Sequence, residues 1–188
     1  MRIIGGSHGG RVLASVGKGD PGAHLRPTTD RVRESLFSAL EGGRFGDPIE
    51  GARVLDLFAG TGALGLEALS RGAAHVTFVE NGRVALGLLG RNIASLGEAA
   101  RTRVVKSNAT RLREASAAAA LVFLDPPYGK GLGAPALTAA LAGGWIAPGA
   151  LIVWEDASEA ALPHGLSRLD ARRYGDTWIT FARHGDGD

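Results

Sequence analysis

The sequence predicts an α/β protein built on one seven-stranded, mainly parallel sheet whose last two strands form a hairpin. Three observations lead to this fold class. Short apolar segments alternate with helical segments from residue 53 onward, glycines end several of the helical segments, and the turn Gly175-Asp176 joins the last two strands. The chain has 188 residues and no cysteine, so it is long enough to bury a core without disulfides or cysteine-bound metal.

The N-terminal part is expected to form a short β-hairpin. Two β segments, 2–4 and 11–16, flank a glycine-rich loop of six residues that leaves their register open. A Gly- and Pro-rich loop follows, after which Thr29 or Asp30 can cap a helix that runs to about Leu40. Its apolar stripe is expected to contain Val32, Leu36, Ala39 and Leu40. We expect residues 1–25 to be a basic extension and residues 26–188 the main domain.

The alternating part of the chain is expected to contain strands joined by helical crossovers. The expected strands are 53–58, 75–80, 103–106, 120–125, 150–155, 166–174 and 177–183. The expected helices are 63–71, 83–96 and 134–141. Crossovers of this kind cover both faces of a parallel sheet with helices.

Positive charge is concentrated at the N-terminus. Residues 1–33 carry six basic and two acidic side chains, whereas the whole chain has a formal charge of only +2. This asymmetry indicates that one end of the molecule meets a polyanion, with an ordinary solvated loop as the alternative. The candidate contacts are Arg2, Arg11, Lys18, Arg26 and Arg33.

The first candidate site is the turn after the strand expected at 53–58. Gly60 and Gly62 allow the backbone to approach a ligand at the carboxyl end of a strand, where open α/β sheets bind ligands. Glu80 ends the next strand, where its carboxylate can accept both hydroxyls of a ribose. The acidic Asp56 suits a ligand that carries a cation, such as S-adenosylmethionine, better than it suits NAD. A tight structural turn with a surface Glu is the alternative.

The second candidate site is the motif Asp125-Pro126-Pro127-Tyr128. The exocyclic amine of a nucleobase is a poor nucleophile because its lone pair is delocalised into the ring. The Asp125 carboxylate and the Pro126 carbonyl can accept its two N–H groups, and the prolines hold these acceptors in place. Tyr128 can stack on the base. A rigid turn without chemistry is the alternative.

Four segments together resemble the RsmD family of bacterial 16S rRNA guanine-N2 methyltransferases: 2–6, 26–34, 55–71 and 125–128. The resemblance implies a class I methyltransferase fold, S-adenosylmethionine as methyl donor and one guanine of 16S rRNA as acceptor, in a 30S subunit or an assembly intermediate. It also implies a cytoplasmic enzyme whose basic N-terminal residues contact RNA. A monomer without membrane segment or metal is expected.

The resemblance also assigns the site residues by position. It implies that the cofactor is bound by Asp56, Phe58, Ala59, Gly60, Thr61, Gly62, Glu80, Asn81, Asn108, Ala109, Thr28 and Arg31. In this set, Glu80 binds the ribose, residues 108–109 bind the adenine edge, and residues 26–31 close over the methionine end. Asn108 departs from the Asp of many related enzymes, and Ser7 to Arg11 departs from the aromatic or basic residue that often precedes a Gly-Arg pair.

Three other functions stay open at this stage. An adenine-N6 or DNA amino-methyltransferase could use the same Asp-Pro-Pro-Tyr motif. An NAD-dependent oxidoreductase could use the same glycine turn, and a catalytically inert RNA-binding protein could have the same charge distribution. The five histidines lack a metal-ligand spacing, and Trp145, Trp154 and Trp178 are expected to pack within or beside the core.

Overall fold

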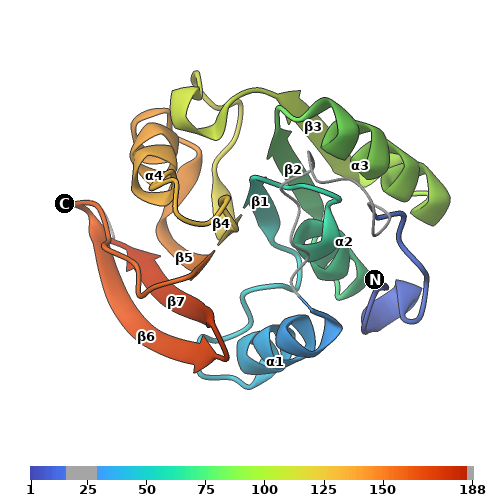
Figure 1. Ribbon diagram of the computed structural model, residues 1–188, viewed down its shortest axis with the longest axis horizontal. Coiled ribbons are helices and arrows are strands. Elements are labelled where there is room, and N and C mark those ends of the chain that lie inside the picture. The colour runs from blue at the N-terminus through green and yellow to red at the C-terminus, as the bar shows by residue number, and fades with distance from the viewer. Residues whose placement is uncertain (16–28, 186–188) are drawn as a thin grey trace.

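One seven-stranded sheet forms the centre of the computed structural model, which describes residues 1–15 and 29–185 (Figure 1). Its strand order is β3-β2-β1-β4-β5-β7-β6. The strands are β1 (Arg53–Leu57), β2 (His75–Glu80), β3 (Thr102–Lys106), β4 (Ala119–Leu124), β5 (Ile146–Asp156), β6 (Leu166–Tyr174) and β7 (Thr177–His184). Neighbours among β1 to β5 pair in parallel, and β7 pairs antiparallel with β5 and β6. The predicted fold class is therefore confirmed.

Helices and short 3-10 turns connect the strands. They are η1 (Gly6–His8), α1 (Asp30–Glu41), α2 (Ala63–Ser70), α3 (Arg83–Leu96), η2 (Ala99–Arg101), η3 (Ala109–Arg111) and α4 (Gly133–Ala142). Thr29 caps α1 as expected, since its hydroxyl accepts a hydrogen bond from the Val32 amide at 3.3 Å. Among the described helices, none is both long enough and apolar enough to cross a membrane.

The largest boundary error concerns β5, which begins at Ile146 and not at Ala150. Pro148 and Gly149 interrupt the apolar pattern and hide the start of the strand from sequence analysis. In the structure, Ile146 pairs with Ala119 of β4, and the register then shifts before Leu121. A partner far away in the sequence thus extends the strand.

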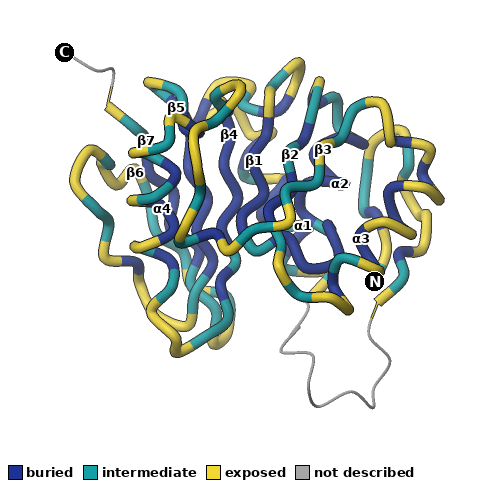
Figure 2. Tube along the Cα trace, turned by 90° about the horizontal axis from the view of Figure 1, so that it is seen from above, coloured by how far each residue is buried: buried dark blue, intermediate teal, exposed yellow. Residues whose placement is uncertain are grey.

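Alternate residues of the central strands face two different layers. Val54, Leu121 and Leu151 pack in a cluster with α1, α2 and α3, whereas Leu55 and Val122 pack in a second cluster with α4. The central strands are buried along most of their length (Figure 2). This sandwich of helices around a largely parallel sheet is the arrangement that the sequence predicts.

The N-terminal segment, residues 1–15, folds back on itself without forming the two predicted strands. One antiparallel bridge joins Arg2 to Val12, and η1 occupies the loop. The amides of Ile4 and Gly5 donate to the carboxylate of Glu67 on α2 at 2.7 and 2.9 Å. Ile3 pairs with Arg11 and Gly10, so the next amide on the same side of the segment is that of Gly5, and its bond to Glu67 ends the β pairing. The predicted boundary between residues 25 and 26 lies outside the described residues.

Arg33 corrects the set of predicted RNA contacts, because its side chain is fully buried. It donates to the Arg2 carbonyl and to Asp30, both at 2.6 Å, and lies 3.9 Å from Glu67. The buried stripe of α1 consists of Arg33, Leu36, Phe37 and Leu40. Arg33 therefore takes the first place on the stripe, which the sequence analysis gave to Val32, and joins α1 to the N-terminal segment.

Candidate active site

The two candidate motifs meet at the carboxyl ends of β1 and β4, which are neighbours in the sheet although β2 and β3 separate them in sequence. The order of the parallel strands reverses between β1 and β4, and such a switch point opens a crevice for ligands. The amide of Asp125 lies 3.4 Å from the Leu57 carbonyl, to which it donates. The sheet thus brings the glycine turn, residues 56–62, next to the Asp-Pro-Pro-Tyr motif, residues 125–128.

The glycine turn has an unusual backbone conformation. Phe58, Gly60 and Gly62 all have a positive φ, of 60°, 58° and 82°. A side chain is disfavoured in this region, and Phe58 is the only described residue other than glycine that adopts it. At Gly62 a Cβ atom would also lie 2.5 Å from the Leu89 side chain. Backbone strain of this kind is common in ligand-binding turns, where the surrounding structure stabilises it.

Asp56, the first residue of this turn, is almost completely buried. Its Oδ2 accepts a hydrogen bond at 3.0 Å from the amide of Gly65 in the first turn of α2. Burial raises the pKa of the Asp56 carboxyl to about 7; the Gly65 hydrogen bond acts in the opposite direction, and the nearby charge of Glu80 raises the pKa further. The carboxylate therefore favours a cation that comes close to it.

Glu80, at the end of β2, holds two turns together. Its Oε2 accepts from the Gly60 amide at 2.8 Å, and its Oε1 accepts from the amides of Asn81 and Gly82 at 2.8 and 2.7 Å. Two carboxylate oxygens can accept about four hydrogen bonds in total. Glu80 thus shapes the glycine turn and retains some capacity to accept from a hydroxyl group.

Asn108 and Ala109 follow β3, the strand next to β2. Asn108 is exposed, and its Oδ1 caps η3 by accepting from the Thr110 amide and hydroxyl, both at 2.9 Å. Ala109 is buried in the core cluster that packs against α4. Four adjacent strands, in the order β3, β2, β1 and β4, therefore end next to the residues that are predicted to bind adenine, ribose, the methionine part and the acceptor base.

The Asp-Pro-Pro-Tyr motif is held from the β5–β7 side of the sheet. The Tyr128 hydroxyl donates to Glu155 Oε1 at 3.1 Å and is 3.2 Å from the Thr177 hydroxyl. Burial raises the pKa of Tyr128 to about 12; the Thr177 hydrogen bond opposes this, and the charges of Glu155 and Asp125 reinforce it. The phenol is therefore neutral at physiological pH, and contacts at its hydroxyl end orient the ring.

The structure does not bring all the predicted RNA contacts to this site, and of the contacts predicted between residues 26–31 and the methionine end of the cofactor it describes only Arg31. Arg11 is exposed, but its guanidinium donates at 2.7 Å to the Ser95 carbonyl in the last turn of α3, at the end of the helix far from the strand-end site. Arg2 is exposed beside Asp30, and Arg31 is exposed in the first turn of α1. The predictions for Lys18, Arg26 and Thr28 lie outside the described residues.

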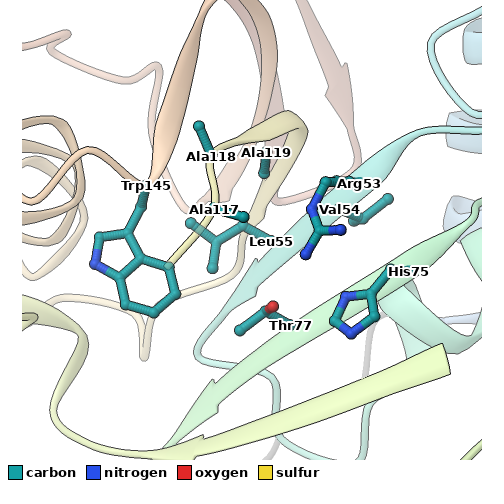
Figure 3. Close-up of a pocket in the computed structure, with 9 residues that line it drawn as sticks. All are labelled: Arg53, Val54, Leu55, His75, Thr77, Ala117, Ala118, Ala119 and Trp145. Carbon is teal, nitrogen blue, oxygen red and sulfur yellow. The ribbon is translucent and has the colours of Figure 1, made fainter. Parts of the chain in front are cut away.

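A small pocket opens at the opposite edge of the sheet (Figure 3). Arg53 and His75, at the amino ends of β1 and β2, line it together with Thr77 and the buried Trp145. The carboxyl-end motifs do not line this pocket, so we do not assign it to the candidate site.

Several buried polar residues were not predicted from the sequence, among them Glu155, which contacts Tyr128, and also Glu67 and Asn92. Glu67, in the middle of α2, accepts from the N-terminal segment and from Arg71, and Asn92 of α3 contacts both that segment and the glycine turn. A polar residue on an otherwise apolar helix stripe was the available signal. Asn92 lies on the buried stripe with Leu88 and Leu96.

Comparison with known proteins agrees with this geometry. The family model described as conserved hypothetical protein 95 matches residues 1–183. Ribosomal RNA small subunit methyltransferase D of Escherichia coli (strain K12) is 45% identical over 164 residues, which cover 87% of this chain and 78% of the relative. The Haemophilus influenzae protein of the same name is 36% identical and covers 86% of this chain and 81% of its own length.

A solved structure shows the same fold over the whole chain. The protein yhhF from Escherichia coli superposes with a TM-score of 0.83 at 39% identity, covering 100% of this chain and 99% of its own. Sheet order, site geometry and relatives agree with one another. The chain therefore belongs to the RsmD family of methyltransferases and has the class I methyltransferase fold.

Proposed function

We propose that this protein transfers a methyl group from S-adenosylmethionine to the exocyclic N2 of a guanine in 16S rRNA. The observation that supports this most is the juxtaposition of the glycine turn and the Asp-Pro-Pro-Tyr motif at the switch point of the sheet, where the Asp125 amide donates a hydrogen bond to the Leu57 carbonyl. The name of the Escherichia coli relative supports rRNA as the substrate class. The guanine N2 follows from the family resemblance.

The residues at the four strand ends fit S-adenosylmethionine. Asp56 supplies a buried carboxylate for the ammonium group, Glu80 supplies its remaining acceptor position for a ribose hydroxyl, and Asn108 with Ala109 offers a polar and an apolar contact for adenine. When bound, this cofactor supplies an electrophilic methyl group. Thr28 and Arg31 remain predicted contacts with its methionine end.

The Asp-Pro-Pro-Tyr motif binds the acceptor base and orients its amine. Asp125 and the Pro126 carbonyl accept the two N–H groups of the amine, which localises its lone pair for in-line attack. Tyr128, oriented through Glu155 and Thr177, stacks on the base. With S-adenosylmethionine bound, the amine would take the methyl group from the cofactor's sulfur, and the surplus proton on the amine would then pass to water.

The pH dependence of cofactor affinity tests the role of Asp56. Because burial raises its pKa to about 7, a cationic ligand must displace a proton from Asp56 at lower pH. We expect the Kd of S-adenosylmethionine to rise as the pH falls from 7.5 to 6, approaching about tenfold per pH unit. Calorimetric titration measures this slope. Asp56→Asn should abolish it, and a wild-type Kd that is independent of pH would contradict the assignment.

The titration of Asp56 should affect folding stability and cofactor affinity in opposite directions. As the pH rises, cofactor affinity should increase, whereas the free energy of unfolding should decrease. The folded-state pKa of Asp56 lies above the ordinary value of 3.8, so the folded protein binds more protons than the unfolded chain between these two values. The contribution of neutral Asp56 to the free energy of unfolding is therefore lost as the pH rises through this interval.

Substrate identity is tested by methyl transfer with the modified base mapped. The purified enzyme is incubated with labelled S-adenosylmethionine in two parallel reactions. One reaction contains free 16S rRNA, and the other contains 30S particles from an unmethylated strain. We expect one N2-methylguanosine, identified by nuclease digestion and mass spectrometry. N6-methyladenosine as the product, or transfer to DNA alone, would refute the proposed substrate, and the more active reaction identifies the assembly stage.

A further inference from the structure

Asn92 is a buried polar residue that the proposed reaction does not use. It lies on α3, is 1% exposed and stands on the same helix stripe as Leu88, Leu89 and Leu96. A polar side chain at such a position lowers stability unless its hydrogen bonds are satisfied. The partners of Asn92 therefore explain what its amide does.

Those partners come from two distant parts of the chain. Asn92 Oδ1 accepts from the Ala14 amide at 2.7 Å, and Nδ2 donates to the Ala14 carbonyl at 3.1 Å. The same Nδ2 donates to the Thr61 carbonyl at 2.9 Å. One side chain thus binds Ala14 as a neighbouring β-strand would and uses its remaining N–H on the glycine turn.

Thr61 is the residue of the glycine turn that lies between its two left-handed glycines, Gly60 and Gly62. Its carbonyl is fixed by Asn92, and its hydroxyl points to the Met1 sulfur at 3.9 Å. Leu13, next to Ala14, is buried in the same core cluster as Ile3. Met1 of the N-terminal segment therefore contacts the glycine turn directly, and Ala14 is linked to the turn through Asn92.

We propose that Asn92 is a positioning residue that makes the N-terminal segment a structural part of the cofactor site. Its amide ties Ala14 to Thr61 and so holds the glycine turn in the conformation that receives the cofactor. Cofactor binding should in turn stabilise the N-terminal segment, because coupling between two linked sites is reciprocal. This inference rests on the proposed function, since it takes S-adenosylmethionine as the ligand of the turn.

Ser70 provides a matched control for this coupling. Its hydroxyl is also buried and also holds the N-terminal segment, by donating to the Gly5 carbonyl and accepting from the His8 amide at 2.9 Å. Ser70 lies at the end of α2 far from the glycine turn. Ser70→Ala therefore loosens the same segment without touching Thr61.

The test compares Asn92→Ala, Asn92→Asp and Ser70→Ala with the wild type in the full-length protein. Calorimetry measures the Kd of S-adenosylmethionine, and hydrogen exchange measures amide protection in residues 8–14 and 57–66 with and without cofactor. We expect both Asn92 variants to bind about tenfold more weakly. Binding should protect residues 8–14 in the wild type and in Ser70→Ala, but not in the Asn92 variants. Asn92→Asp retains the acceptor for Ala14, so it carries the test if Asn92→Ala does not fold.

The possible outcomes separate this inference from the proposed function. A wild-type protein that binds no S-adenosylmethionine would refute the proposed cofactor. Normal wild-type binding with an unchanged Kd in the folded Asn92 variants would overturn the inference alone. An equal loss of affinity in Ser70→Ala would also overturn it, because the effect would then come from loosening of the segment in general.

Discussion

Asp125→Ala is expected to lower kcat for methyl transfer by about 10³-fold, the loss typical when a preorganised hydrogen-bonding group at a reacting centre is removed. The reason is that, in the proposed mechanism, Asp125 supplies the charged acceptor for the amine, whereas the predicted cofactor contacts lie at the ends of β1, β2 and β3. The Kd of S-adenosylmethionine should therefore stay unchanged. Single-turnover methyl transfer to 16S rRNA, together with calorimetric titration of the cofactor, measures both quantities.

The conservative variant Asp125→Asn separates acceptor geometry from charge. Its amide oxygen can still accept one N–H group, but it carries no negative charge to support the positive charge that develops on nitrogen. We expect a kcat between those of the wild type and Asp125→Ala. Near-normal methylation by the alanine variant would rule out the mechanism, since the amine would then need no acceptor at this position.

Glu80→Ala is expected to weaken cofactor binding by about 10²-fold, because it removes the proposed charge-assisted hydrogen bond to the ribose. It also removes the acceptor that holds the Gly60 amide at 2.8 Å, so the glycine turn loses a support. The Kd of S-adenosylmethionine is the measurement, and kcat at saturating cofactor should change much less than the Kd.

Asp156→Ala is the matched control for Glu80→Ala. Asp156 also ends a strand at the same edge of the sheet, and its Oδ1 also accepts from the following amide, that of Ala157, at 2.7 Å. It ends β5, beyond β4 and away from the predicted ribose position. The control should leave cofactor affinity unchanged. Equal affinities for wild type and Glu80→Ala would exclude a ribose contact at Glu80.

Much of the fold was predictable because its signals are local. Helix α3 spans 83–96 and strand β2 spans 75–80 as predicted, since apolar periodicity and flanking glycines mark both. It was also predictable that the carboxylates near the ends of β1, β2 and β4 lie on the same side of the sheet, because the carboxyl ends of parallel strands all lie at one edge. The start of β5 was not predictable, because its pairing partner is Ala119 of β4.

The charged residues show where sequence analysis stops. Arg33 carries the same charge as Arg2, yet Arg33 is buried against Glu67 and Asp30 whereas Arg2 is exposed. Whether a basic side chain faces solvent depends on which way its helix is rotated against the rest of the fold. Composition and residue spacing do not predict this rotation. They miss it here because Glu67, a buried acid far along the chain, compensates the charge of Arg33.

The order of the strands and helices along the chain, the glycine turn and the Asp-Pro-Pro-Tyr motif follow from the amino-acid sequence, because propensities and turn chemistry act between near neighbours. Three contacts depend instead on the packing of the folded chain: the Asp125 amide donates to the Leu57 carbonyl, Glu67 accepts from the N-terminal segment, and Asn92 joins Ala14 to Thr61. These contacts connect residues that are far apart in the sequence. Asn92, for example, lies 31 positions from Thr61 and 78 positions from Ala14. Packing of helices onto the sheet creates such contacts, and a buried amide or carboxylate then has to bind whatever backbone groups the packing brings to it.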